Sequence, residues 1–340
     1  MAPSPAKNRK PLFITAAATV AVLTVIAVIV AFLLSKGEDG PTGNPDGSPT
    51  DVAKAYLEAL AQGDAQAALD LSATQPATTD WLTDDILKLQ LEKLPITEVQ
   101  VIGEEKKPDA DERTSVVKVA AKFGGQRTEG ELNMVVVDNQ WKLSAAFVDA
   151  TTQEIHGFGY DEEVDALRVF GKPLPQSRHF YVFPGYLEIK SSTPYLNINE
   201  LPPTTLDDVT ALKDTSVKPK YSMTDEGMPA AEQAVRAWVD NCFNGGKNTG
   251  ECEGAINGNW GEDYELSTMR VRGPIDLSEA NLRLADDASG PLVYTSSIRV
   301  PFSVVEKGTG RVIEDTLYFS DKLKVNLGVQ PPKAFVDTGR

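Results

Sequence analysis

The longest apolar pattern in the chain is the uncharged run from Leu12 to Leu34. At about 1.5 Å per residue, a helix over this run is long enough to cross a hydrocarbon core of roughly 30 Å. Lys7, Arg9 and Lys10 precede the run. Basic residues on the N-terminal side of a membrane span keep that side in the cytoplasm. The pattern predicts a protein of the cell membrane with a cytoplasmic tail at 1–11 and a single-pass transmembrane helix at 12–34. The residues after this helix are expected to be extracellular.

A cleaved signal peptide is the alternative interpretation, because it also begins with basic residues and an apolar run. Its apolar region usually has about 7–15 residues and ends at a small-x-small cleavage site. The run here is longer, and Ala31 to Ser35 do not form such a site, so we favour an uncleaved signal anchor. Residues 35–50 are mostly turn formers and small polar residues, which predict a flexible spacer.

The pattern after the spacer has helical spacing up to about residue 94. Thr50 is expected to cap a first helix, Asp51 favours its positive end, and Gly63 ends it. Its apolar stripe consists of Val52, Ala55, Tyr56, Ala59 and Leu60. Asp64 is expected to cap a short second helix, and a third helix is expected from about Trp81 to Leu94.

The period changes to two after Pro95, and alternation predicts four strands with one apolar face each. They begin with Thr97 to Gly103 and end with Trp141 to Phe147. Helices followed by such strands predict an α+β layer, with the helices on one face of an antiparallel sheet.

The run YLEALAQGDAQAALDLS from Tyr56 to Ser72, the third helix and strands ending in NQWKLSAAF carry a resemblance. Residues 51–150 resemble the nuclear-transport-factor-two-like (cystatin-like α+β) superfamily. More narrowly, they are similar to its membrane-anchored surface forms in Gram-positive bacteria, including the N-terminal domain of low-affinity penicillin-binding proteins. The resemblance implies a cone-shaped cavity, which in the superfamily's enzymes usually holds an Asp or His acid/base pair. Residues 50–150 contain no histidine, and acids such as Glu131 fall on the polar face of a strand.

Residues 151–195 predict a small all-β module with a hairpin around Pro184-Gly185. This run is similar to the PG-Y-x-V/I hairpin of bacterial surface repeats. Its aromatic side chains are Phe180, Tyr181, Phe183, Tyr186 and Tyr195. The first four are our candidate ligand or partner surface, since aromatic faces stack on glycans. The alternative, which we favour, is that the cluster forms the core of the small sheet.

Residues 196–227 contain several prolines and little periodicity, which predicts a connector on the surface. Residues 228–340 repeat the earlier pattern, with a helix opening at Pro229 and its apolar face reaching Cys242. Four strands are expected after it, at Tyr264–Arg272, Leu292–Val305, Arg311–Phe319 and Lys322–Leu327. We therefore expect a second α+β domain, separated from the first by the small β module and the connector.

The charge of the chain limits its partners. The formal net charge is −16, all 49 acidic residues follow the apolar run, and three of the 33 basic residues precede it. An acidic exterior of this kind repels nucleic acid, so nucleic acid is excluded as a partner. The only cysteines, Cys242 and Cys252, lie on the exported side, where an even count predicts a disulfide.

None of the short motifs supports catalysis or a cofactor. Ser115 and Lys118 match Ser-x-x-Lys of penicillin-recognising enzymes, but that motif needs a helix and these residues lie in a predicted strand. The glycine-rich run from Gly245 to Gly250 lacks phosphate-loop spacing, and the acids at 109–112 lack EF-hand spacing. His156 and His179 lie in the small β module and are more simply explained as hydrogen-bonded histidines. We therefore predict no catalytic, cofactor-binding or metal-binding residue.

These observations predict a non-enzymatic extracytoplasmic binding or scaffolding protein, anchored in the cell membrane and linked to envelope or cell-wall processes. The expected partner is an envelope protein or a wall precursor. The layout is similar to teicoplanin-resistance-associated membrane proteins, which usually carry an N-terminal zinc ribbon before the anchor; this chain has no cysteine there. The alternative is an envelope hydrolase or isomerase that uses the cavity of the first domain, and a third is a spacer for the last domain.

Overall fold

The computed structural model describes residues 47–105, 112–152, 166–175, 177–209, 214–243, 260–284, 290–295, 297–319 and 323–336. The chain divides into Met1–Pro45 and Asp46–Arg340, and every described residue belongs to the second unit. The predicted transmembrane helix at 12–34 lies outside the described residues. Within the described part of the chain, no helix is both long and apolar enough to span a membrane.

The described residues of the first part of the chain contain three helices, α2 (Pro49–Gln62), α3 (Ala65–Asp70) and α4 (Asp84–Lys93). Helix α2 begins two residues earlier than expected, because Ser48 rather than Thr50 is its N-cap. The Ser48 hydroxyl accepts a hydrogen bond from the main-chain N–H of Asp51 in the first turn. Gly63 ends α2 in the left-handed conformation, and Asp64 caps α3, as the sequence predicts. The third helix starts later than expected, after its N-cap Thr83.

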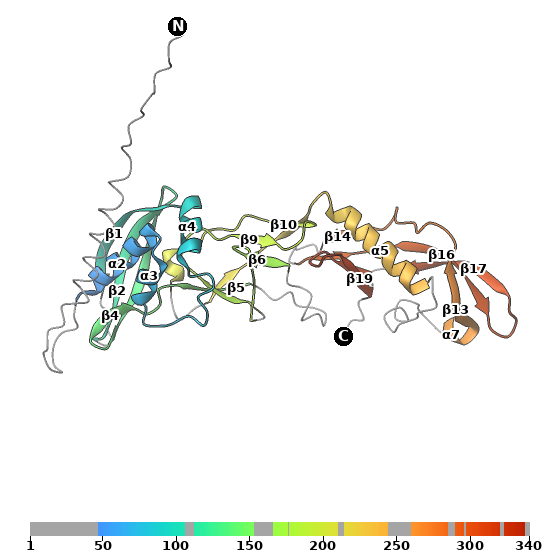
Figure 1. Ribbon diagram of the computed structural model, residues 1–340, viewed down its shortest axis with the longest axis horizontal. Helices are drawn as coiled ribbons and strands as arrows, with labels where there is room; N and C mark the ends of the chain where they lie inside the picture. Colours follow the sequence, from blue (N-terminus) through green and yellow to red (C-terminus); the bar gives the residue numbers. More distant parts are fainter. Residues whose placement is uncertain are drawn as a thin grey trace, which may run out of the picture. The chain divides into compact units, whose positions relative to one another are not determined.

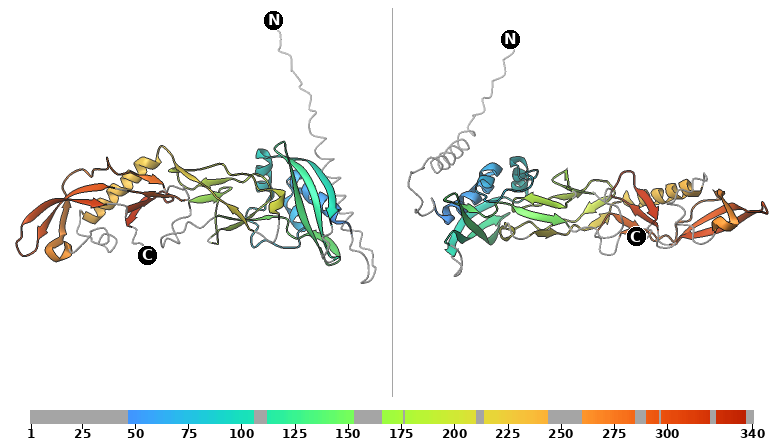
Figure 2. Two further views of the ribbon diagram at one scale, coloured as in Figure 1. Left: turned by 180° about the vertical axis from the view of Figure 1, so that it is seen from behind. Right: turned by 90° about the horizontal axis from the view of Figure 1, so that it is seen from below.

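The helices lie on a four-stranded antiparallel sheet (Figure 1). Its strands follow the chain in the order β1 (Ile96–Glu105), β2 (Thr114–Phe123), β3 (Gln126–Val137) and β4 (Gln140–Leu143). Val117, Val119 and Ala121 are buried on the face of the sheet that is toward the helices. In the view from behind, the helices lie on the far side of the strands (Figure 2). The predicted α+β layer is therefore confirmed.

The middle of the chain is built from short strands in several small sheets. These are β5 (Val148–Thr152), β6 (Leu167–Val169), β7 (Lys172–Pro173), β8 (His179–Val182) and β9 (Ile189–Ser191). Strand β5 pairs with β8, and β6 lies between β7 and β9. All of these pairs are antiparallel. The hairpin expected around Pro184-Gly185 is wrong, because β8 pairs with β5 and β9 pairs with β6, in different sheets.

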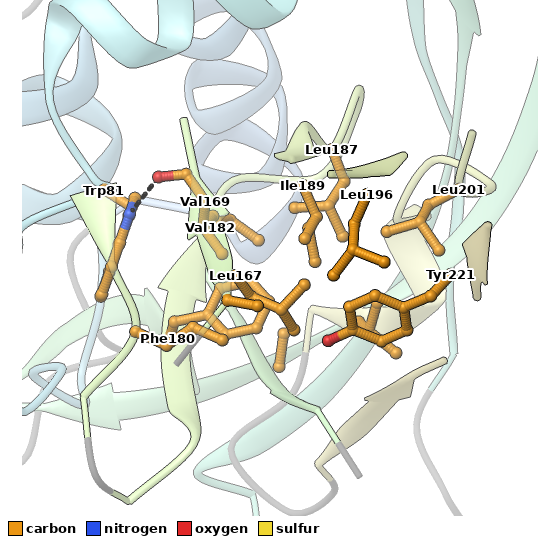
Figure 3. Packing of buried hydrophobic residues seen from close by; sticks show 14 of the residues in the cluster. Trp81, Leu167, Val169, Phe180, Val182, Leu187, Ile189, Leu196, Leu201 and Tyr221 are labelled. Atoms are coloured by element: carbon orange, nitrogen blue, oxygen red, sulfur yellow. Dashed lines mark hydrogen bonds between the residues drawn. The ribbon is translucent and has the colours of Figure 1, made fainter. Parts of the chain in front are cut away.

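The segment expected to be a surface connector, 196–227, contributes strands and buried side chains to the same module. It contains β10 (Leu196–Ile198), the short 3-10 helix η1 (Leu206–Asp208), β11 (Thr215–Val217) and β12 (Tyr221–Met223). Strand β11 pairs in parallel with β5, and β10 pairs with β12. Leu196, Leu201 and Tyr221 point into the apolar cluster formed by β6, β8 and β9 (Figure 3). The segment has little periodicity because each strand is only three residues long, too short to show alternation.

Where the structure describes the last part of the chain, it shows two helices and two sheets. The helices are α5 (Gly227–Phe243) and α7 (Trp260–Asp263). One sheet has the order β13 (Tyr264–Val271), β16 (Ile298–Glu306) and β17 (Val312–Phe319). The other has the order β14 (Arg283–Leu284), β15 (Leu292–Tyr294), β18 (Leu323–Asn326) and β19 (Lys333–Val336). The apolar face predicted for α5 is buried and contacts strands of both sheets.

The predicted strand from Leu292 to Val305 is wrong as a single element. The structure divides it into β15 and β16, which belong to different sheets. Between them, Ser297 has a φ of 57°, a left-handed value that ends an extended strand, and the Thr295 hydroxyl donates to the carbonyl of Leu323 at 2.7 Å. The polar run Thr295-Ser296-Ser297 interrupts the apolar alternation at this break, and the prediction of one strand passed over it.

Buried apolar residues from all three parts belong to one continuous cluster. The division into domains at 51–150, 151–195, 196–227 and 228–340 therefore stays a prediction.

Candidate functional site

The interior of the first α+β layer is filled by large side chains. Tyr56, Trp81, Met134 and Trp141 are all buried. The Tyr56 hydroxyl donates a hydrogen bond to the carbonyl of Ala146 at 3.0 Å, and burial raises the pKa of Tyr56 far above its usual value. Tyr56 is therefore neutral at physiological pH and acts as a structural hydrogen-bond donor.

Among the residues that the structure describes, no acid/base pair occupies this interior. Of the Asp, Glu and His residues described between 47 and 152, none is buried. A general acid or base in an enzyme cavity is usually partly desolvated, because burial shifts its pKa toward the working pH. None of these described side chains has the buried environment that strongly shifts a pKa.

The Ser-x-x-Lys residues lie on strand β2, as expected, and each has its own partner. The Ser115 hydroxyl donates to Glu104 Oε1 at 2.8 Å, whereas Lys118 Nζ lies 2.6 Å from Glu105 Oε1. The hydrogen bond and charge of Glu105 raise the pKa of Lys118, which opposes a role as a base. The glycine-rich run at 245–250 and His156 lie outside the described residues.

The aromatic candidate surface is divided between core and exterior. Phe180 and Phe183 are fully buried, so they cannot stack on a ligand at the surface. The Phe180 ring contacts Trp81 edge-on, with the ring centroids 6.0 Å apart (Figure 3). Tyr181 and Tyr186 are half-buried and pack edge-on against other phenylalanine rings. For Phe180 and Phe183, the structure has the core arrangement that the sequence analysis favours.

Buried side chains join the first layer to the middle module. Trp81 Nε1 donates to the carbonyl oxygen of Val169 at 2.9 Å (Figure 3). Gln90 on α4 donates through Nε2 to the carbonyl oxygens of Phe183 and Tyr186, at 3.1 and 2.8 Å. Each of these bonds connects residues about 90 positions apart, so they fix the two parts of the chain against each other.

A second set of contacts extends this connection. The main-chain N–H of Glu131 donates to Asp207 Oδ1 at 3.0 Å, which holds η1 against β3. A Cβ on Gly130 would lie 2.6 Å from Leu206 Cβ, so the close approach of η1 requires glycine there. Toward the last part, the Thr193 hydroxyl donates to the carbonyl of Leu327 at 2.7 Å.

Polar side chains converge at one place on the middle module. Asp149 on β5, His179 on β8 and Asp214, just before β11, each place one potential ligand atom within 4.8 Å of the other two. Asp149 Oδ1 lies 3.2 Å from His179 Nδ1. Tyr181 lies beside them, and burial together with the Asp149 and Asp214 charges raises the pKa of its hydroxyl.

An exposed apolar pair lies on the last part of the chain. Val312 and Tyr318 on β17 are 60% and 67% exposed, and β17 is the edge strand of its sheet. The two residues are six positions apart and therefore point to the same face of the strand. The Arg299 guanidinium lies 5.9 Å from the centre of the Tyr318 ring.

Sequence reasoning missed both of these clusters. Asp149, His179 and Asp214 are far apart in sequence and follow no motif spacing, so no local signal joins them. The alternation along β17 marks the apolar residues but does not tell which face is covered. Cys242 is buried on α5, whereas Cys252 lies outside the described residues, so the disulfide stays a prediction.

Comparison with known proteins gives little further information. No protein-family model matches the chain, and no curated protein matches it. One solved structure with similarity to the chain is that of a candidate NTF2-like transpeptidase from Campylobacter jejuni, at 16% sequence identity and a TM-score of 0.22. The match covers 28% of this chain and 97% of that one. The α+β assignment of this chain rests on its own topology.

Proposed function

We propose that the chain is a non-enzymatic binding or scaffolding protein of the cell envelope, anchored in the cell membrane by residues 12–34. In this proposal, residues 51–150 form a nuclear-transport-factor-two-like domain of the kind found on membrane-anchored surface proteins of Gram-positive bacteria. The observation that carries the proposal is the set of buried hydrogen bonds that join the first layer to the middle module.

These bonds suit a scaffold because each donor is buried and reaches a main-chain carbonyl in another part of the chain. Breaking such a bond leaves a buried polar group without a partner, at a cost of about 1–3 kcal/mol per group. Trp81 and Gln90 therefore oppose bending between the first layer and the middle module.

The enzyme alternative receives less support. An envelope hydrolase or isomerase would require a desolvated acid or histidine within the first layer. The described residues place aromatic and aliphatic side chains there, and its carboxylates lie at the surface.

The exposed pair Val312 and Tyr318 is the partner surface that we assign to the last part of the chain. Exposed aromatic residues beside an arginine are typical of protein–protein contact sites. The partner is an envelope protein, in keeping with the predicted extracellular position.

Site-specific photo-cross-linking of the full-length chain in intact cells tests this proposal. A photoreactive residue replaces Tyr318, and the matched control replaces Ile102, which is 49% exposed on the edge strand β1. We expect an adduct with an envelope protein from position 318, which Val312→Asp reduces, and none from position 102. The absence of any adduct at 318, or the same adducts at both positions, would overturn the assignment.

A further inference from the structure

The geometry of one small sheet brings three potential metal ligands together. In the sheet β11-β5-β8, the central strand β5 is antiparallel to β8 and parallel to β11. Thr151 is opposite His179, and Asp149 is opposite Tyr181, so the Asp149 and His179 side chains leave the same face of the sheet on adjacent strands. On the other side, Thr215 is opposite Ala150, which places Asp214 next to Asp149.

The separations fit a single ion. Two ligands bound at about 2.0–2.2 Å to a tetrahedral ion lie roughly 3.3–3.6 Å apart. The distance from Asp149 Oδ1 to His179 Nδ1 is 3.2 Å, and all three ligand atoms lie within 4.8 Å of one another.

The charges and the solvent exposure of these three side chains also fit a bound cation. Within the described part of the chain, no lysine or arginine forms an ion pair with Asp149 or Asp214, so two carboxylates lie close together beside one imidazole. A divalent cation balances two carboxylates and a neutral histidine. The side chains of Asp149 and His179 are 25% and 37% exposed, which leaves the ion an entry path and a position for water.

We propose that Asp149, His179 and Asp214 form a binding site for a divalent transition-metal cation, with Zn²⁺ as the best match. Imidazole nitrogen and carboxylate oxygen are both ligands of zinc, whereas Ca²⁺ takes six to eight oxygen ligands and Mg²⁺ requires octahedral oxygen coordination. The sequence predicts no metal site, because these three residues show no recognisable spacing.

The ion would connect three strands that come from different segments of the chain. Strand β11 belongs to the segment 196–227, and its pairing with β5 spans three residues. A bound cation joins β11 to β5 and β8 at the point where two carboxylates otherwise repel each other. Binding therefore stabilises the middle module, because the ligands come together only in the folded chain.

The experiment is a titration of the full-length chain, purified in detergent, stripped with a chelator and dialysed without reductant. Calorimetry with ZnCl₂ measures affinity and stoichiometry, and thermal unfolding with and without ZnCl₂ measures stabilisation. We expect one Zn²⁺ per chain and a rise in Tm. His179→Gln and Asp214→Asn are expected to weaken binding by about tenfold or more.

Two matched controls carry the same chemical changes away from the site. His156→Gln alters the chain's other histidine, and Asp225→Asn neutralises an exposed acid outside the cluster. Both are expected to bind Zn²⁺ as the unchanged chain does. Asp214 is itself exposed, so a metal-free Tm equal to that of the unchanged chain would show that its variant is folded.

Several outcomes would overturn the proposal. The chain could fail to bind Zn²⁺ stoichiometrically, or bind it equally well in the site variants and the controls. Equal affinity for MgCl₂ or CaCl₂ would also contradict the assignment to a transition metal. A partner adduct at Tyr318 does not depend on any of these results, so the proposed function and the metal site are tested separately.

Discussion

Gln90→Glu is the sharpest test of the connection between the first layer and the middle module. The Gln90 side chain is 2% exposed, and its Nε2 donates to two main-chain carbonyls, those of Phe183 and Tyr186. Its Oε1 is buried and has no hydrogen-bond partner among the described residues. A glutamate has the same shape, but its carboxylate places negative oxygens where the amide donates.

The magnitude follows from the protonation of the new side chain. A glutamate has a pKa of about 4.3 in the unfolded chain, and burial against two carbonyl oxygens raises it in the folded chain. Holding it protonated at pH 7 costs about 3.7 kcal/mol, at 1.36 kcal/mol per pH unit. The protonated acid donates to one carbonyl instead of two, which removes about 1 kcal/mol more. We therefore expect a loss of about 4–5 kcal/mol at pH 7.

The sign of the pH dependence is fixed by linkage. Because the folded-state pKa is raised, the folded variant binds more protons than the unfolded chain, and its stability falls as pH rises above about 4.3. The deficit relative to the unchanged chain is then about 1.5 kcal/mol near pH 4.5 and about 4–5 kcal/mol at pH 7, and it stops growing only when pH passes the folded-state pKa.

Urea unfolding of the full-length chain at pH 4.5 and pH 7, followed by tryptophan fluorescence, measures this difference. Gln233→Glu is the matched control, because Gln233 is exposed on α5. Equal deficits at the two pH values, or a deficit no larger than that of the control, would refute the reasoning.

Two further substitutions test the packing of the first layer. Gly130→Ala places a Cβ 2.6 Å from that of Leu206, and we expect it to lower the free energy of unfolding by about 1–3 kcal/mol, measured by thermal unfolding. Gly103→Ala is the control, because the space around Gly103 is open, and its effect should be small. Equal effects of the two substitutions would contradict the close approach of η1. Tyr56→Phe removes a buried hydroxyl that donates to a main-chain carbonyl and should cost about 1–3 kcal/mol in urea unfolding. Tyr318→Phe, on an exposed ring, should leave stability unchanged, and a similar loss there would oppose the interpretation.

The sequence predicts the local elements well because their signals are local. Gly63 and Asp64 mark the end of one helix and the start of the next, and both act as expected. The alternation of the first four strands gives their number and buried face. The predicted N-cap of the first helix is less accurate, because Ser48 and Thr50 have the same capping chemistry. Pro49 at the first helical position favours Ser48 as the N-cap.

Only the tertiary structure decides which strands pair with each other. The segment 196–227 becomes part of the middle module because β11 adds to β5 in parallel, a contact between residues about 65 positions apart. The strand expected at Leu292–Val305 divides because its two halves bury their side chains in different sheets. The polar run Thr295-Ser296-Ser297 marks the position of this break, but it does not tell that the two halves join different sheets.

For the candidate sites too, the sequence determines some features and the tertiary structure decides the others. The sequence by itself determines that the chain is acidic, that a run at 12–34 is long and apolar enough for a membrane span, and that residues 50–150 lack a histidine. Tertiary structure alone brings Asp149, His179 and Asp214 within 4.8 Å, because strand register sets which side chains meet. Register depends on contacts between distant segments, and no local pattern of residues encodes it.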